Sequence, residues 1–157
     1  MPAQYSEQTF KKAIIANLKK FILEFGKDFS LIGEEYRVQV GGSDFYIDLL
    51  FYNRALSCLV PVELKIGKFK PEHVGQINFY LEALDRDVKK PHENPSVGLV
   101  LCASKDDAVV EYALSRSISP TMVSDYTLYL PDKKILQDKL RELADIAMEQ
   151  DGTGRSK

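Results

Sequence analysis

Three strand-like segments follow one another in the first half of the chain and are joined by two short turns. The first alternates in polarity and ends at a pair of glycines, which is typical of a tight hairpin turn. A short reversal at Asn53 separates the other two. The segments are Tyr36–Val40, Phe45–Tyr52 and Ala55–Lys65. Because consecutive strands with short connections usually pair side by side, they predict one sheet against which the other elements must pack.

Helical and strand-like patterns continue on both sides of these segments. Apolar residues at helical spacing predict helices over Ser6–Phe25, from Pro71 to about Val88, over Asp106–Ser115, and from Pro131-Asp132 to about Ala147. The continuous apolar run Val97–Cys102 predicts a strand that is covered on both faces, and Met122–Leu130 predicts a last strand.

The order of these elements predicts the fold class. It reads helix, three strands, helix, strand, helix, strand, helix, which indicates an α/β fold with a mixed central sheet flanked by helices. No linker or internal repeat divides the chain. We therefore expect one domain over residues 1–149 and a disordered tail at 150–157.

Composition limits the class of protein. Of 157 residues, 45% are apolar and 28% charged, a balance typical of soluble globular proteins. No apolar run approaches the ~20 residues needed to cross a membrane, and the N-terminal residues do not form a charged-then-apolar leader. Cys58 and Cys102 each lie in an apolar run, which favours buried, reduced thiols over a disulfide. We expect a cytoplasmic protein with no membrane partner.

Three charged residues lie in or beside strands that are otherwise apolar. Asp48 interrupts the strand YIDLLFY, and Glu63 and Lys65 end the segment LVPVELK. A buried carboxylate is costly unless it is paired, hydrogen-bonded or bound to a cation. Because strand side chains alternate, Glu63 and Lys65 share one face of the sheet, and pairing through the reversal at Asn53 would bring Asp48 beside Glu63.

Two carboxylates beside an ammonium group have a chemical use. Oxygens of Asp48 and Glu63, together with the backbone carbonyl of Leu64, are suited to hold Mg²⁺ or Mn²⁺, with waters completing the coordination shell. The cation would neutralise a phosphodiester and activate a water for in-line attack. Lys65 would orient that water or stabilise the charge that develops at phosphorus. The same three charged residues are equally compatible with an ordinary ion-pair network at the end of a sheet.

A basic cluster follows the third strand. Lys68, Lys70 and His73 are suited to contact DNA phosphates, which position a substrate without reading its sequence. A solvated loop is the alternative, and the nearby carboxylates favour phosphate contact. The formal net charge of −2 argues against a general nucleic-acid coat protein. It does not exclude a nuclease, because the carboxylates of a metal site lower the net charge while the bound cation restores positive potential locally.

The stretch GGSDFYIDLLFYNRALSCLVPVELKIGKFKPEHVGQINFYLEALD resembles the YhcG-type C-terminal nuclease domain of the PD-(D/E)xK superfamily. The strand DLLFY, the strand end VELK and the segment GKFKPEHVGQINFYL carry the resemblance, which is strongest over residues 21–85 and extends to about residue 143. It implies a restriction-endonuclease-like fold and a metal-dependent DNA endonuclease site. Within that site, Asp48 matches the strand aspartate, Glu63 and Lys65 match the (D/E)xK pair, and Gln76 matches a motif glutamine beside the site.

Two places depart from the superfamily's pattern. The superfamily often carries another acidic residue on the first helix, where this chain has Lys11 and Lys12, with Glu7 one turn earlier. Glu34 and Glu35 lie in a segment that tends to read G-R-Q in similar proteins. Either glutamate is a candidate to supply the missing carboxylate. The departures therefore concern a second metal ion rather than the core of the site.

The residues and the resemblance together predict a metal-dependent endonuclease that hydrolyses DNA phosphodiester bonds by in-line attack of an activated water. The alternatives are a catalytically inactive nuclease-fold module that binds DNA or a protein partner, and an RNA-directed nuclease. Enzymes that cut both strands often pair two sites, so a homodimer is an expected assembly. We expect target choice to reside in a separate N-terminal or partner domain.

Overall fold

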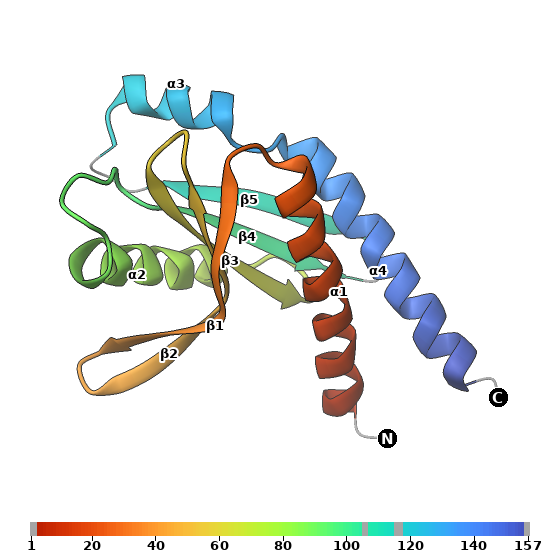
Figure 1. The fold of residues 1–157 in the computed structure, drawn as a ribbon. Helices are drawn as coiled ribbons and strands as arrows, with labels where there is room; N and C mark the ends of the chain where they lie inside the picture. Colours follow the sequence, from red (N-terminus) through yellow and green to blue (C-terminus); the bar gives the residue numbers. More distant parts are fainter. Residues whose placement is uncertain (1–2, 105–106, 115–117, 156–157) are drawn as a thin grey trace.

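The computed structural model, which describes residues 3–104, 107–114 and 118–155, contains one five-stranded mixed sheet (Figure 1). The strands are β1 (Phe29–Val40), β2 (Ser43–Asn53), β3 (Cys58–Ile66), β4 (Val97–Ala103) and β5 (Ala108–Leu114). They lie in the order β1-β2-β3-β4-β5, with β3 and β4 parallel and the other neighbours antiparallel. The predicted α/β fold with a mixed sheet is confirmed, although β1 begins well before the predicted Tyr36.

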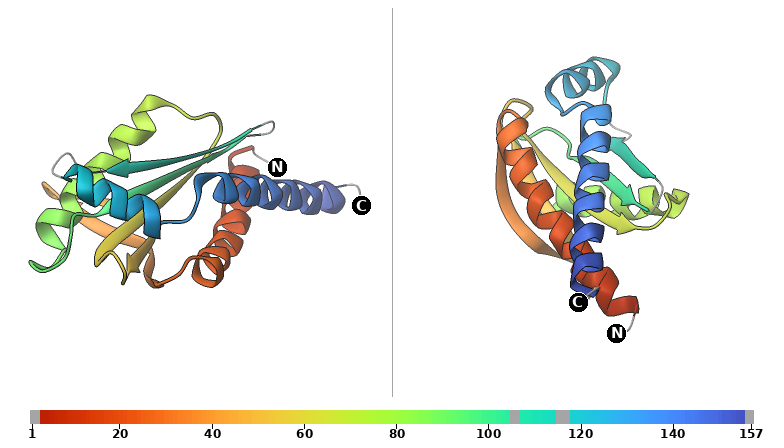
Figure 2. Two further views of the ribbon diagram at one scale, coloured as in Figure 1. Left: turned by 90° about the horizontal axis from the view of Figure 1, so that it is seen from above. Right: turned by 90° about the vertical axis from the view of Figure 1, so that its right-hand side faces the viewer.

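Four helices flank the sheet in the described part of the chain. They are α1 (Ala3–Phe25), α2 (Pro71–Asp87), α3 (Pro120–Tyr129) and α4 (Lys133–Arg155). Helices α1 and α4 lie against each other on one face of the sheet, and α2 covers the opposite face (Figures 1 and 2). No helix among the described residues has both the length and the apolar character needed to span a membrane.

Two apolar layers fill the space between the sheet and these helices. The layer under α1 and α4 includes the buried residues Ile14, Leu18, Val62, Leu64, Leu136 and Leu140. The layer under α2 includes the buried residues Leu50, Leu59, Ile77, Leu81 and Val100. Strand β4 is buried along its whole length, as its continuous apolar run predicts. Removing this apolar surface from water is the main force that holds the layers together.

The segment predicted as a helix over Asp106–Ser115 is a strand, β5, so that prediction is wrong. β5 pairs antiparallel along the whole of β4. The β-branched residues Val109 and Val110 favour a strand, and the segment is short for a stable helix. The hydrogen bonds offered by the edge of β4 therefore decide the outcome. The predicted ends at Asp106 and Ser115 lie outside the described residues.

The prediction of a strand over Met122–Leu130 is also wrong, because this segment forms most of α3. Ser119 caps the helix: its hydroxyl oxygen accepts the backbone N–H of Met122 at 3.3 Å. Pro120 occupies the first turn, where its fixed backbone angle suits a helix. Tyr126 is the buried residue of α3. This start signal outweighs the strand preference of the aromatic and β-branched residues that follow.

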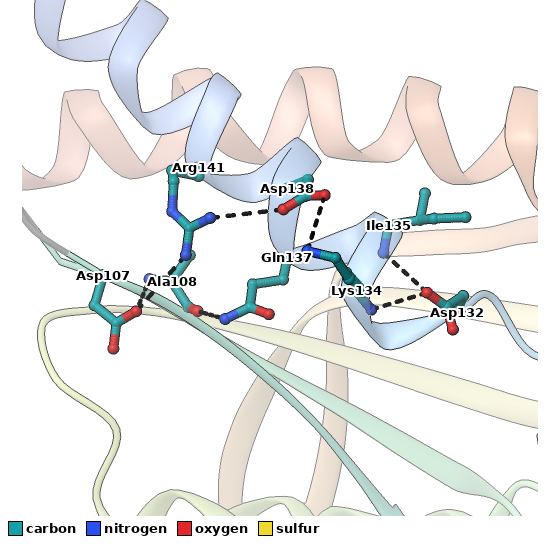
Figure 3. Close-up of polar contacts among 8 residues, drawn as sticks. All are labelled: Asp107, Ala108, Asp132, Lys134, Ile135, Gln137, Asp138 and Arg141. Carbon is teal, nitrogen blue, oxygen red and sulfur yellow. Dashed lines mark hydrogen bonds and ion pairs between the residues drawn. The ribbon is translucent and has the colours of Figure 1, made fainter.

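Polar contacts fix the N-terminal end of α4 beside β5 (Figure 3). Asp132 caps the helix, because its Oδ2 accepts the backbone N–H groups of Lys134 and Ile135 at 3.1 and 3.2 Å. One turn further, the Gln137 amide donates to the carbonyl of Ala108 at the start of β5. The predicted helix start at Pro131-Asp132 is therefore confirmed to within two residues.

Helix α4 extends further than the sequence predicts. It continues to Arg155, past residue 149, at which we expect the ordered domain to end. No proline interrupts the segment, and lengthening an existing helix adds a backbone hydrogen bond without a new nucleation step. Residues 150–155 belong to α4, 156–157 lie outside the described residues, and the expected disordered tail stays a prediction. The single-domain boundary stays a prediction.

Gly98 in β4 sets how closely α2 approaches the sheet. A Cβ atom added at Gly98 would overlap the Ile77 side chain, whereas one added at Gly75 on the exposed side of α2 would meet nothing within 4 Å. We predict that Gly98→Ala lowers the free energy of unfolding by about 1–3 kcal/mol through overpacking. The control Gly75→Ala should raise it by about 0.5–1 kcal/mol through helix propensity. Urea unfolding measures both, and equal stability of the two variants would contradict the close approach.

Candidate active site

Strands β2 and β3 part from each other at Asp48 and Glu63, and we call this place the strand fork. Their last backbone pair is Leu49 with Val62, after which β3 continues alongside β4 and β2 continues alongside β1. Asp48 and Glu63 are the next residues on the two separating strands. At the fork, backbone N–H groups therefore have no acceptor on a partner strand. These groups are partly buried, so they need another acceptor.

The two carboxylates satisfy these backbone groups across the fork. The N–H of Asp48 donates to Glu63 Oε1 at 2.8 Å, and the N–H of Leu64 donates to Asp48 Oδ2 at 2.8 Å. The structure thus brings Asp48 and Glu63 together, as strand alternation predicts. Each carboxylate uses one oxygen in these hydrogen bonds, which leaves Asp48 Oδ1 and Glu63 Oε2 for other partners.

Strand β2 changes orientation at the fork, and β1 is irregular at the same level. Ile47 and Leu49 are two residues apart, yet Ile47 packs in the layer under α2 and Leu49 in the layer under α1 and α4. On β1, Glu35 has a left-handed backbone with φ of 47°, and it is skipped between the pairs that its neighbours make with β2. Such irregularities are common beside active sites, where they re-aim side chains.

An ammonium group faces each of the two remaining carboxylate oxygens. Lys65 Nζ lies 3.8 Å from Glu63 Oε2, and Lys11 Nζ lies 3.2 Å from Asp48 Oδ1. Sequence reasoning missed Lys11 as a site residue. The signal was its spacing, because Lys11 precedes the buried residues Ile14 and Leu18 by three and seven positions and so lies on the inward side of α1.

Glu63 is the more deeply buried carboxylate, with 5% of its side chain exposed against 17% for Asp48. Burial, followed by the charge of Asp48, raises the pKa of Glu63 to about 7. The hydrogen bond from Asp48 and the charges of Lys65 and Lys11 act in the opposite direction. At neutral pH the metal-free pair therefore holds a proton for part of the time, and a cation at the fork would favour the doubly ionised pair.

The donor set at the fork fits a hard divalent cation. Within a strand, the N–H and C=O of one residue point to the same edge, so the Leu64 carbonyl faces the fork into which its N–H donates. Together with Asp48 Oδ1 and Glu63 Oε2, it would offer three oxygens. Mg²⁺ is commonly held by one or two carboxylates, with waters and substrate phosphates as the other ligands.

The additional acidic candidates do not join this pair. Glu34 forms an ion pair with Lys19 at 2.9 Å, and Glu35 lines a groove beside Asp48. Glu7 is exposed on α1. Among the described residues, no three acidic, histidine or cysteine side chains lie close enough to hold a metal ion together. Asp48 and Glu63 are therefore the acidic side chains at the fork that could hold a cation.

Gln76 contacts Tyr80 rather than a carboxylate. Its amide donates to the Tyr80 hydroxyl oxygen at 3.2 Å, one helical turn further along α2. Burial raises the pKa of Tyr80, and the negative charge of Glu63 raises it further, so the hydroxyl lies within the field of the carboxylate pair. The structure therefore places Gln76 beside Tyr80, and its predicted role at the site stays a prediction.

The predicted phosphate contacts divide into two kinds. Lys68 and Lys70 are exposed, and Lys70 makes only a loose 4.0 Å ion pair with exposed Glu72. His73 instead caps the start of α2, because its Nδ1 accepts the Lys70 N–H at 3.2 Å. Burial and the charge of Lys65 lower the pKa of His73. The imidazole is therefore neutral at neutral pH and offers a phosphate only its Nε2–H.

We predict that Glu63→Gln stabilises the metal-free protein at high pH. Folding raises the pKa of Glu63 from 4.5 to about 7, so the stability linked to its proton is complete below about pH 4.5 and is lost as the pH rises through 7. Glutamine keeps an acceptor for the Asp48 N–H but does not ionise. The variant should exceed the wild type by up to about 3 kcal/mol at pH 8 and match it near pH 4.

Urea unfolding across this pH range tests the prediction. Exposed Glu24 provides the control, because Glu24→Gln removes a carboxylate from the surface instead of the fork. A difference between Glu63→Gln and the wild type that does not change with pH would show that Glu63 ionises in the folded protein as it does in the unfolded chain.

Similar proteins are known for most of this chain. It is 42% identical over 137 residues to a protein of Escherichia coli (strain K12) named "Putative nuclease YhcG", and the match covers 87% of this chain but 36% of that protein.

Two solved structures are also similar: an XisH family protein from Nostoc punctiforme PCC 73102 and SSO0001. The first has 16% identity and a TM-score of 0.39 over 58% of this chain and 68% of that one. The second has 13% identity and a TM-score of 0.42 over 78% of this chain and 60% of that one.

The family comparison covers the site as well as the fold. The model of the YhcG PDDEXK nuclease domain matches residues 1–141, a range that contains the strand fork, Lys65 and Gln76. The mixed sheet and its flanking helices agree with that assignment. The resemblance noted in the sequence is confirmed: the chain belongs to the YhcG PDDEXK nuclease domain family.

Proposed function

We propose that this chain is a Mg²⁺- or Mn²⁺-dependent endonuclease that hydrolyses phosphodiester bonds of DNA. The strand fork carries the proposal, because Asp48 Oδ1 and Glu63 Oε2 are left free of backbone amides beside the ammonium group of Lys65. Membership of a nuclease-domain family supports the general reaction. The geometry of the fork supports the need for a metal and the choice of residues.

Asp48 and Glu63 would hold the cation through these two oxygens, with the Leu64 carbonyl as a third ligand. When bound, such a cation neutralises the charge of a phosphodiester and lowers the pKa of a coordinated water. The hydrogen bonds across the fork keep both carboxylates in place before the cation arrives. The chain therefore contributes a preorganised acceptor rather than a flexible one.

Lys65 would act on the attacking water and on the phosphate. Its ammonium group lies on the α2 side of the sheet, where its charge adds to the burial that lowers the pKa of His73 and opposes the burial that raises the pKa of Cys102. In that position it would orient the water for in-line attack or stabilise the negative charge that develops at phosphorus. Gln76 is a positioning residue in this scheme, because it holds the Tyr80 hydroxyl near the carboxylates.

Lys68 and Lys70 would bind DNA phosphates on the approach to the fork. Both are exposed and follow β3 directly, so a backbone bound to them would lie close to Lys65. Contacts of this kind give affinity without sequence preference. The chain spans 36% of the length of its relative YhcG. In our proposal, target choice comes from a separate N-terminal or partner domain.

We predict that the protein nicks supercoiled plasmid in Mg²⁺ or Mn²⁺ and that Asp48→Asn and Lys65→Met each reduce the rate by at least about 100-fold. Both substitutions nearly keep the side-chain shape, so the fold should remain intact. Lys90→Ala provides a matched control, since Lys90 is exposed and lies beyond the far end of α2. Its cleavage rate should equal that of the wild type, and chelation of the metal should stop cleavage.

The results separate an enzyme from an inactive binding module. Equal, metal-independent cleavage by the wild type and Asp48→Asn would refute the proposed site. A wild-type protein that folds, does not bind Mn²⁺ and does not cleave plasmid, branched DNA, single-stranded DNA or RNA would favour the catalytically inactive binding module. Cleavage of RNA alone would keep the site and change the substrate.

We also predict that Lys68→Ala and Lys70→Ala together weaken DNA binding and make it less sensitive to salt. Each phosphate contact contributes roughly 0.9 to the slope of log K against log salt concentration, so the double variant should lose up to about 1.8. Fluorescence anisotropy in the inactive Asp48→Asn background measures this slope without cleavage. An unchanged slope would show that these two lysines form an ordinary solvated loop.

A further inference from the structure

Among the residues that the structure describes, Lys11 is the charged side chain of α1 that contacts the carboxylate pair. Its ammonium group lies 3.2 Å from Asp48 Oδ1, which is the oxygen that the fork's own hydrogen bonds leave free. The side chains of Lys11 and Asp48 are 33% and 17% exposed, so this ion pair is partly shielded from water. A cation of the chain itself is therefore paired with this oxygen.

A divalent cation at the fork and the ammonium group of Lys11 compete for the same oxygen. Mg²⁺ binds a carboxylate oxygen at about 2.1 Å, so it would place two positive charges beside the single charge of Lys11. Like charges at that separation repel strongly in a partly buried site. Binding of the metal is therefore linked to movement of Lys11.

A groove of about 290 Å³ beside α1 offers the displaced side chain a new place. Lys11, Asp48 and Glu35 all line it. Glu35 makes no ion pair with any described residue, and its left-handed backbone lies at the level of Asp48, because its neighbours Glu34 and Tyr36 pair with Leu49 and Ile47. Holding a glutamate in that backbone conformation costs energy, which a role for its carboxylate would explain.

We propose that Lys11 is a built-in counter-cation that occupies Asp48 Oδ1 in the metal-free protein and transfers to Glu35 when a divalent cation binds. This inference rests on the proposed metal-dependent function. It makes Lys11 a regulator of metal affinity rather than a catalytic residue. Similar nucleases often carry an acidic residue at the place on the first helix where this chain has Lys11. In this proposal Glu35 of β1 provides a carboxylate near that place, as a partner for Lys11 and not as a metal ligand.

Isothermal titration with Mn²⁺ tests the competition between Lys11 and the metal. Lys11→Met should bind Mn²⁺ on the order of tenfold more tightly than the wild type, because no ammonium group has to leave. Lys12→Met is the matched control: Lys12 lines the same groove but forms no ion pair with Asp48, so its loss should change the affinity by less than about twofold. Lys11→Gln provides a second variant if Lys11→Met fails to fold.

A double-mutant cycle tests the transfer to Glu35. Glu35→Gln should weaken Mn²⁺ binding several-fold when Lys11 is present and have little effect in the Lys11→Met background. Simple loss of a nearby negative charge would instead weaken binding equally in both backgrounds, and that result would overturn the transfer. Unchanged or weaker binding by Lys11→Met would overturn the competition.

The outcomes also separate this inference from the proposed function. If the wild type binds Mn²⁺ and cleaves DNA while Lys11→Met binds no more tightly, the inference fails and the nuclease stands. If neither protein binds Mn²⁺ and the wild type cleaves nothing, the metal site fails and the inference fails with it. If only Lys11→Met binds Mn²⁺, Lys11 excludes the metal from the wild type, which supports the competition and refutes the metal-dependent function.

Discussion

The two hydrogen bonds across the strand fork are the constraint on which the rest of the site depends. Where β2 and β3 part, backbone N–H groups lose their ladder partners, and buried N–H groups without an acceptor are costly. The carboxylates of Asp48 and Glu63 supply the acceptors, each with one oxygen at 2.8 Å. The same interaction that ends the pairing of two strands therefore fixes two carboxylates side by side and directs their remaining oxygens outward.

The layered fold explains why the fork is approached by cations from opposite sides. Lys65 extends toward the layer under α2, where Cys102 and His73 lie within its field. Lys11 reaches the fork from α1, which covers the other face. The carboxylates thus lie between Lys65 of β3, on the α2 side of the sheet, and Lys11 of α1, on the other side. The close packing of α2 on Gly98 keeps Gln76 and Tyr80 in a fixed relation to the same pair.

The sequence predicts a site residue when the residue stands out within its own strand or helix, and it fails when the residue's partner lies on another element. Asp48 and Glu63 are recognisable because Asp48 interrupts one apolar strand and Glu63 ends the next, and pairing of these strands through the reversal at Asn53 brings the two residues together. Lys11 is not recognisable in the same way, since its partner is on another element and ordinary helices carry many lysines. The two misassigned segments, β5 and α3, are short, so neighbouring structure decides them: the free edge of β4 pairs with one, and the Ser119 cap starts the other. Local patterns therefore predict the carboxylates better than the cations that surround them.

The pKa of Glu63 is raised because the fork buries this carboxylate and holds it close to a second one. Burial and the neighbouring charge of Asp48 both disfavour a second negative charge, yet the backbone hydrogen bonds hold the carboxylates together. The metal-free pair is therefore short of positive charge, and a proton, an ammonium group or a divalent cation can supply it. These three compete for the same oxygens, so conditions that favour one weaken the others. If a divalent cation binds the pair, low pH and Lys11 would both oppose it for this reason, and a phosphate group, which adds negative charge beside the pair, would shift the balance toward the divalent cation.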